Sequence, residues 1–116
     1  MYRSQLLEVA VEEVEHERVI RARGEIDVSS IEPLRRAVAD ARGKLVATVV
    51  DLSGVDFIDS TGLHLMLDAS FEAAARGWPL TFVPSQPVFR LLEVSGTLGV
   101  VPLGEARPRA QPERFT

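Results

Sequence analysis

The segment from Leu45 to Val50 constrains the fold more than any other part of the sequence. It is an almost unbroken apolar run, and Val46, Val49 and Val50 are β-branched. Such a run is typical of a central strand that is covered on both faces. The chain has 116 residues, 46% of them hydrophobic, which is enough to enclose such a strand in one compact domain.

Two segments before this run predict strands that each have one exposed face. In residues 7–12, and again in residues 20–26, apolar side chains alternate with mostly charged ones. The polar link at residues 15–17 is short enough for a hairpin. Short apolar stretches at residues 80–83 and 98–101 predict two further strands downstream.

The first predicted helix follows the second strand. Ser29 and Glu32 have the spacing of a capping box, and Pro33 is tolerated in the first turn of a helix. Apolar residues then recur at helical spacing as far as Ala41, and Gly43 is the expected C-terminal stop.

The second predicted helix follows the central strand and a polar turn at residues 53–54. It begins at Asp59 or Ser60, both of which are favoured N-cap residues, and it ends at Gly77. Its buried stripe is expected to consist of Leu63, Met66, Leu67, Ser70, Ala73 and Ala74.

A third helix is predicted between residues 84 and 96, with a core face formed by Val88, Leu91 and Leu92. The element order is therefore strand–strand–helix–strand–helix–strand–helix–strand, which predicts an α/β fold with a mixed β-sheet and helices packed against it. We expect residues 1–102 to form a single domain and residues 103–116 to form a flexible C-terminal tail.

Composition and charge exclude several classes of protein. The net charge of −4 argues against a nucleic-acid binder. Cysteine is absent, and His16 and His64 lie far apart, so we expect neither a metal site nor a cofactor. Neither a signal peptide nor an apolar stretch of about 20 residues is found, which predicts a cytoplasmic protein without membrane insertion. Nothing in the sequence requires more than a monomer.

The sequence also argues against an enzyme. It lacks the glycine-rich motifs that hold phosphates, GxxxxGK[ST] and GxGxxG. His64 lies four residues beyond Ser60 on the same predicted helix, where it cannot serve as the base of a nucleophile elbow. We therefore expect no catalytic residue.

The segment from Val49 to Leu67 contains the candidate site, at the start of the second helix. A helix start has free N–H groups and a positive dipole end, which favour an oxygen ligand or an anion. A phosphate placed there adds about −1.5 to −2 charges at pH 7. Taken alone, this local chemistry favours a plain helix cap over a regulatory site, because nearly every helix needs a cap.

Three segments, which follow one another along the chain, favour the regulatory site over the plain helix cap. Residues 51–63, with the sequence Asp-Leu-Ser-Gly-Val-Asp-Phe-Ile-Asp-Ser-Thr-Gly-Leu, resemble the signature of the STAS domain family. The Gly-Glu-Ile-Asp segment at 24–27 and the block at 84–96 also resemble conserved family segments. The similarity covers residues 5–102 and is greatest to the bacterial anti-sigma factor antagonists.

This resemblance implies a phosphorylation switch at Ser60, with Thr61 as a secondary candidate. In such antagonists the unphosphorylated protein binds an anti-sigma factor, commonly a GHKL-type serine kinase, and so releases a sigma factor. Phosphorylation ends binding, and a phosphoserine phosphatase resets the protein. The partner-binding residues that the resemblance implies or that adjoin its motif are Asp27, Asp59, Ser60, Thr61, Gly62 and His64.

Several alternatives remain open at this point. Asp27 is equally well explained as a turn residue ahead of Ser29, and Gly62 as a small residue for close packing. His64 stands where relatives usually have a small residue, and a solvated helix residue explains it more simply than a partner contact. The resemblance also allows a non-switching STAS scaffold, or an accessory subunit of a stress complex or a lipid-transport ATPase.

Overall fold

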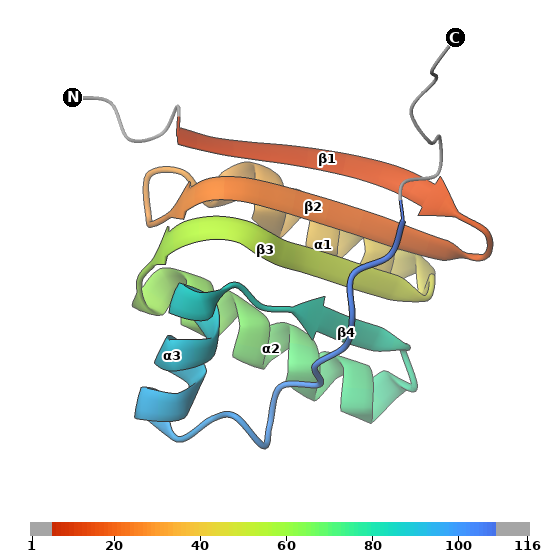
Figure 1. The fold of residues 1–116 in the computed structure, drawn as a ribbon. Helices are drawn as coiled ribbons and strands as arrows, with labels where there is room; N and C mark the ends of the chain where they lie inside the picture. Colours follow the sequence, from red (N-terminus) through yellow and green to blue (C-terminus); the bar gives the residue numbers. More distant parts are fainter. Residues whose placement is uncertain (1–5, 109–116) are drawn as a thin grey trace, which may run out of the picture.

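The computed structural model describes residues 6–108, which form one four-stranded sheet with three helices (Figure 1). The elements in chain order are β1 (Leu7–Val14), β2 (Glu17–Ile26), α1 (Glu32–Lys44), β3 (Thr48–Ile58), α2 (Ser60–Arg76), β4 (Leu80–Val83) and α3 (Gln86–Ser95). The sheet order is β1-β2-β3-β4, with β1 antiparallel to β2 and the other pairs parallel. This confirms the predicted mixed sheet. Within residues 6–108, no helix is both long and apolar enough to cross a bilayer.

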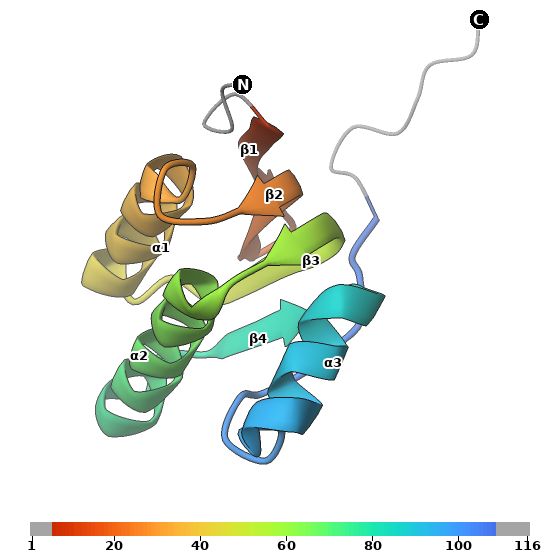
Figure 2. The same cartoon turned by 90° about the vertical axis from the view of Figure 1, so that its left-hand side faces the viewer.

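The two faces of the sheet differ in what covers them. Figure 2 shows α1 and α2 together on one side of the sheet, with α3 and the C-terminal segment toward the other. Strand side chains alternate between faces, so Ile20 and Val50 are buried in the main core, whereas their neighbours Arg21 and Asp51 form an ion pair on the opposite face. The central strand is therefore buried on both faces over its first half, as its apolar run predicts.

The predicted last strand at residues 98–101 is wrong, because that stretch forms a turn. The next segment makes only an isolated bridge between Leu103 and Phe82 of β4. The Phe82 N–H donates to Pro102 O at 2.8 Å, and the Gly104 N–H donates to Phe82 O at 2.9 Å. Strand β4 is too short to support a longer ladder, so the sheet has four strands.

The first part of the predicted tail, residues 103–108, makes contacts with the sheet. The Arg107 Nε donates to Glu17 Oε1 at 2.8 Å, and Arg21 donates to the carbonyl of Arg107 at 3.0 Å. The hydrogen bond from Arg107 lowers the pKa of Glu17. Arg107 thus connects residues 103–108 to β2 through Glu17 and Arg21, although this segment has few apolar residues. Residues 109–116 lie outside the described part of the chain.

Both predicted ends of α1 are wrong. The N-cap is Ile31, which makes no side-chain capping bond, so Ser29 and Glu32 do not form a capping box. The helix also continues past Gly43 to Lys44, and its C-cap is Leu45, which has φ 53°. This longer helix lets the Val46 N–H donate to Ala41 O at 3.2 Å, so contacts made just before β3 override the glycine stop.

The predicted polar turn at residues 53–54 is instead part of β3. The register against β2 shifts twice, between Arg21 and Arg23 and between Gly24 and Glu25, and β3 carries one extra residue at each shift. Bulges of this kind bend a strand without ending it. They bring Ile58 opposite Ile26, so that β2 and β3 end together.

Candidate functional site

The candidate site lies where β2 and β3 end side by side. Ile26 and Ile58 are paired, and the Asp59 N–H donates to Ile26 O at 3.2 Å. Asp27 and Asp59, which are far apart in the sequence, therefore follow directly on two adjoining strand ends. The parallel pairing of β2 with β3 thus brings together the two acids that the sequence predicts for this surface.

Asp59, and not Ser60, caps α2. Its backbone is extended, with φ −112° and ψ −170°, and its carboxylate accepts the Thr61 N–H at 2.9 Å. Its carbonyl accepts the N–H groups of Gly62 at 3.1 Å and Leu63 at 3.2 Å. The predicted helix start is confirmed, and the capping function falls to the aspartate.

Ser60 is therefore not needed to cap the helix. Its side chain is exposed, and within residues 6–108 its hydroxyl has no hydrogen-bond partner. Thr61, the secondary candidate, is half-buried. A hydroxyl that is exposed and makes no hydrogen bond can accept a modifying group without breaking any contact in the domain.

Asp27 organises the turn that leads into α1. Its Oδ1 accepts the N–H of Ser29 at 3.0 Å, the hydroxyl of Ser29 at 2.8 Å and the N–H of Ser30 at 3.1 Å. The buried Ser30 hydroxyl donates to Glu25 O at 2.8 Å and accepts the Asp27 N–H at 3.0 Å. These bonds explain why an acid is needed at position 27, whether or not a partner also contacts it.

Gly62 is buried, which favours the packing interpretation over a partner contact. A Cβ at this position would lie 2.7 Å from Ile58 Cγ1 and 2.9 Å from Ile26 Cγ2. The first turn of α2 can approach the ends of β2 and β3 this closely only because residue 62 has no side chain. Gly62 thus sets the position of Ser60 relative to the strand ends.

The exposed side of α2 forms one row along the helix. The buried row consists of Gly62, Leu65, Met66, Ala69, Ser70 and Ala73. The predicted buried stripe was therefore partly wrong, because it omitted Leu65 and Ala69 and included Ala74, which is exposed. At 3.6 residues per turn, the opposite side carries Ser60, His64, Asp68 and Phe71. We call these four exposed residues the α2 outer row.

Asp68 and Phe71 are the residues of this row that the sequence did not predict, and Phe71 is the apolar one. Its side chain is 60% exposed, and it lies about three helical turns beyond Ser60. Near the strand ends, Val28 and Phe57 are also exposed large hydrophobic residues, at 77% and 42%. The spacing of Phe71 from Ser60 was the signal available in the sequence.

The charge around Ser60 is acidic. From Leu52 to Ala75 the sequence contains no Lys or Arg, whereas it contains Asp56, Asp59, Asp68 and Glu72. Among residues 6–108, no group of three His, Asp or Glu side chains is placed to hold a metal ion. The chemistry that this site offers is therefore an exposed hydroxyl on an acidic, partly apolar surface.

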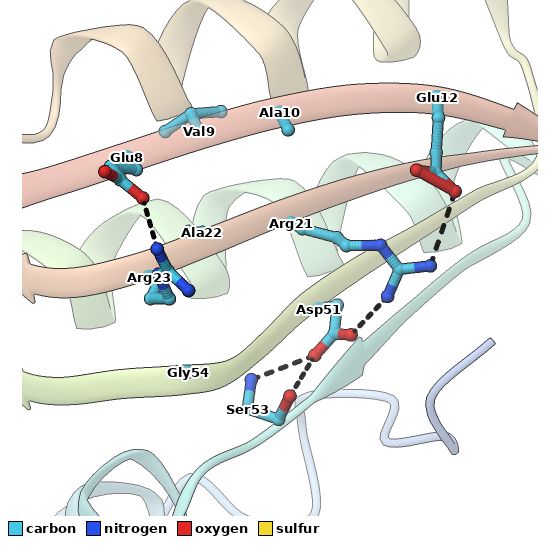
Figure 3. A pocket seen from close by; sticks show the side chains of 10 residues that line it. All are labelled: Glu8, Val9, Ala10, Glu12, Arg21, Ala22, Arg23, Asp51, Ser53 and Gly54. Carbon is cyan, nitrogen blue, oxygen red and sulfur yellow. Dashed lines mark hydrogen bonds and ion pairs between the residues drawn. The ribbon is translucent and has the colours of Figure 1, made fainter. Parts of the chain in front are cut away.

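A hollow on the open face of the sheet is the other place where polar groups gather (Figure 3). There Arg23 pairs with Glu8 at 2.9 Å, and Arg21 pairs with Asp51 at 2.9 Å and Glu12 at 3.5 Å. Figure 3 shows these ion pairs between side chains of β1, β2 and β3. Ion pairs between neighbouring strands therefore line the hollow.

Comparisons with known proteins agree with this fold. Among solved structures, an anti-sigma factor antagonist from Mycobacterium paratuberculosis is 26% identical with a TM-score of 0.75, and the match covers 84% of each chain. The anti-sigma factor antagonist SpoIIAA in its unphosphorylated form is 25% identical with a TM-score of 0.67, over 84% of this chain and 89% of that one. SpoIIAA, the Bacillus cell fate determinant, in its phosphorylated form is 24% identical with a TM-score of 0.65, over 84% and 92%.

The search of curated proteins found no match. The family model described as Mlab, STAS domain, matches residues 9–102, which includes every helix and almost the whole sheet. The chain therefore belongs to the STAS domain family.

Proposed function

We propose that this protein is an anti-sigma factor antagonist whose binding is switched off by phosphorylation of Ser60. The observation that carries the proposal is the exposed Ser60 hydroxyl, which has no hydrogen-bond partner within residues 6–108 although it lies in the first turn of a well-anchored helix. Two structural neighbours that share this fold at 25% and 26% identity are anti-sigma factor antagonists.

The proposed partner is an anti-sigma factor that is also a GHKL-type serine kinase. In its unphosphorylated state, the protein binds this partner in the cytoplasm and releases a sigma factor. Phe71 in the α2 outer row, and Val28 and Phe57 near the strand ends, are exposed apolar side chains that a partner could cover. The protein performs no reaction itself, and a phosphoserine phosphatase restores the binding form.

A phosphate on Ser60 ends binding for an electrostatic reason. It adds about −1.5 to −2 charges at pH 7 next to Asp59 and within a stretch that has no Lys or Arg. A partner surface seated on Ser60 would have to strip water from that charge without a lysine or arginine of this chain close in sequence to neutralise it. The domain itself stays folded, because Ser60 contributes no hydrogen bond to it.

A pull-down from native lysate tests the proposal with three variants. Wild type and Ser60→Ala should capture the same kinase, and Ser60→Asp should lose at least about tenfold of it, equal to about 1.4 kcal/mol. Val94→Asp is the control for added negative charge, because Val94 is an exposed side chain on α3. Capture of the kinase by Ser60→Asp at the wild-type level would contradict the switch.

One observation favours a second candidate, a non-switching STAS scaffold or accessory subunit of a stress complex or a lipid-transport ATPase. The Asp59 carboxylate already accepts the Thr61 N–H, so the helix start offers a phosphate fewer free donors than an uncapped one. In that case Ser60→Asp and wild type would capture the same partner, and that partner would have no kinase activity.

A further inference from the structure

We propose that His64 pairs with the phosphate on Ser60 and holds it along the exposed side of α2. This inference concerns the phosphorylated form and therefore rests on the proposed function. It assigns to His64 a positioning role that is separate from any partner contact.

The geometry of α2 places the two side chains together. Residues four apart on a helix are neighbours on its surface, with Cβ atoms about 6 Å apart. Both Ser60 and His64 are exposed, and both lie in the α2 outer row, opposite the row that packs on the sheet. A phosphate on Ser60 and the imidazole of His64 thus project from the same side of the first two turns.

Charge makes His64 the natural counter-ion. It is the only basic side chain in the sequence from Leu52 to Ala75, and an imidazolium is a cation with two N–H donors. The charged groups near this edge of the sheet include the acids Asp56, Asp59, Asp68 and Glu72 of the same stretch, and on β2, α1 and the turn between them Glu25, Asp27, Arg36 and the Glu32–Arg35 pair at 3.5 Å.

The order of the two groups also suits the helix. An anion placed four residues before a cation is the favourable arrangement of such a pair, because the anion lies nearer the positive end of the helix dipole. Asp59 already occupies the capping position. The phosphate is therefore expected to turn away from the cap and toward His64.

The test uses the full chain with phosphoserine installed at position 60 during translation, so that no kinase is needed. Phosphorus NMR follows the second ionisation of the phosphate, whose ordinary pKa is about 6. With His64 present, the imidazolium stabilises the dianion, and the midpoint should lie about 0.15 to 0.4 pH lower than in His64→Gln. The ring resonances of His64 should also move on phosphorylation.

His16 supplies the matched control. It lies in the β1–β2 turn, and the ten-residue strand β2 separates it from the site. The His16→Gln variant should keep the low midpoint, and about 1 M salt should weaken the effect of His64. An equal midpoint in wild type and His64→Gln would overturn the pairing. Because the phosphate is installed directly, that outcome is independent of whether a kinase recognises Ser60.

Discussion

The turn from Asp27 to Ser30 and the turn from Asp59 to Gly62 are built from similar residues at adjoining strand ends, yet they use their hydroxyl groups differently. In the first turn, the Ser29 hydroxyl donates to Asp27, whereas the buried Ser30 hydroxyl accepts the Asp27 N–H and donates to Glu25 O of β2. In the second turn, the aspartate caps the helix by itself, and Ser60 stays exposed.

This difference shows what makes a serine available for modification. At the end of β2 the aspartate lies outside the helix, so its carboxylate binds the serines that lead into α1. At the end of β3 the aspartate is the N-cap itself, so the next residue is already helical and points outward. A shift of a few residues in where the helix begins thus separates a structural serine from a candidate phosphoacceptor.

The largest expected effect tests how closely the second turn approaches the sheet. Gly62→Ala should lower the free energy of unfolding by about 2 kcal/mol, because its Cβ would overlap Ile58 and Ile26. Urea denaturation measures this change. Gly43→Ala is the control, since a Cβ there meets nothing within 4 Å and should stabilise the helix by about 0.5–1 kcal/mol. Equal stability of Gly62→Ala and wild type would contradict the packing account.

The next prediction compares the two kinds of serine directly. Ser30→Ala should destabilise the domain by about 1–2 kcal/mol, because it leaves the Asp27 N–H without its acceptor. Ser60→Ala should change stability by less than about 0.5 kcal/mol. Thermal unfolding of both variants is the measurement, and a Ser60→Ala variant as unstable as Ser30→Ala would remove the distinction.

A smaller effect is expected from the cap of α2. Asp59→Ala should cost about 1 kcal/mol, because the Thr61 N–H loses its acceptor. Asp59→Asn keeps a capping oxygen and should recover most of that loss. If both substitutions were equally destabilising in urea, the carboxylate charge and not the cap would be what matters.

The smallest effect lies away from both turns. Arg107→Ala should lower the thermal midpoint only slightly at pH 7, as expected of a partly exposed ion pair. The hydrogen bond from Arg107 lowers the pKa of Glu17 below its ordinary value, so the contribution of the pair is present above that ordinary value and disappears as the pH falls through the lowered pKa. Unfolding curves of wild type and Arg107→Ala should therefore converge in acid, and a constant difference would contradict the pairing.

Local patterns predicted most of the fold. The apolar run before residue 51, the alternating strands and the glycine stop at Gly77 all gave correct elements, because each depends on neighbours in the sequence. The error in β3 arises from a contact between segments distant in the sequence, because its bulged path follows from its register with β2. The end of α1 instead follows from a local hydrogen bond, from the Val46 N–H to Ala41 O.

The position of the candidate site was predictable from the sequence, but its hydrogen bonds were not. The helix start at Asp59 follows from the sequence, whereas Asp27 holds its own turn through bonds that a capping-box pattern at Ser29 does not indicate. The burial of Gly62 depends on two isoleucines from different strands. The ends of β2 and β3 are brought together by tertiary contacts, which only the structure reveals.

Mass spectrometry of the protein after incubation with the captured kinase and ATP tests the central claim most directly. The expected result is one phosphate, located on Ser60, with Ser29, Ser30 and Thr61 unmodified and with the phosphorylated protein no longer bound to the kinase. A phosphate on the Asp27–Ser30 turn, or phosphorylated Ser60 that still binds the kinase as tightly as before, would contradict it.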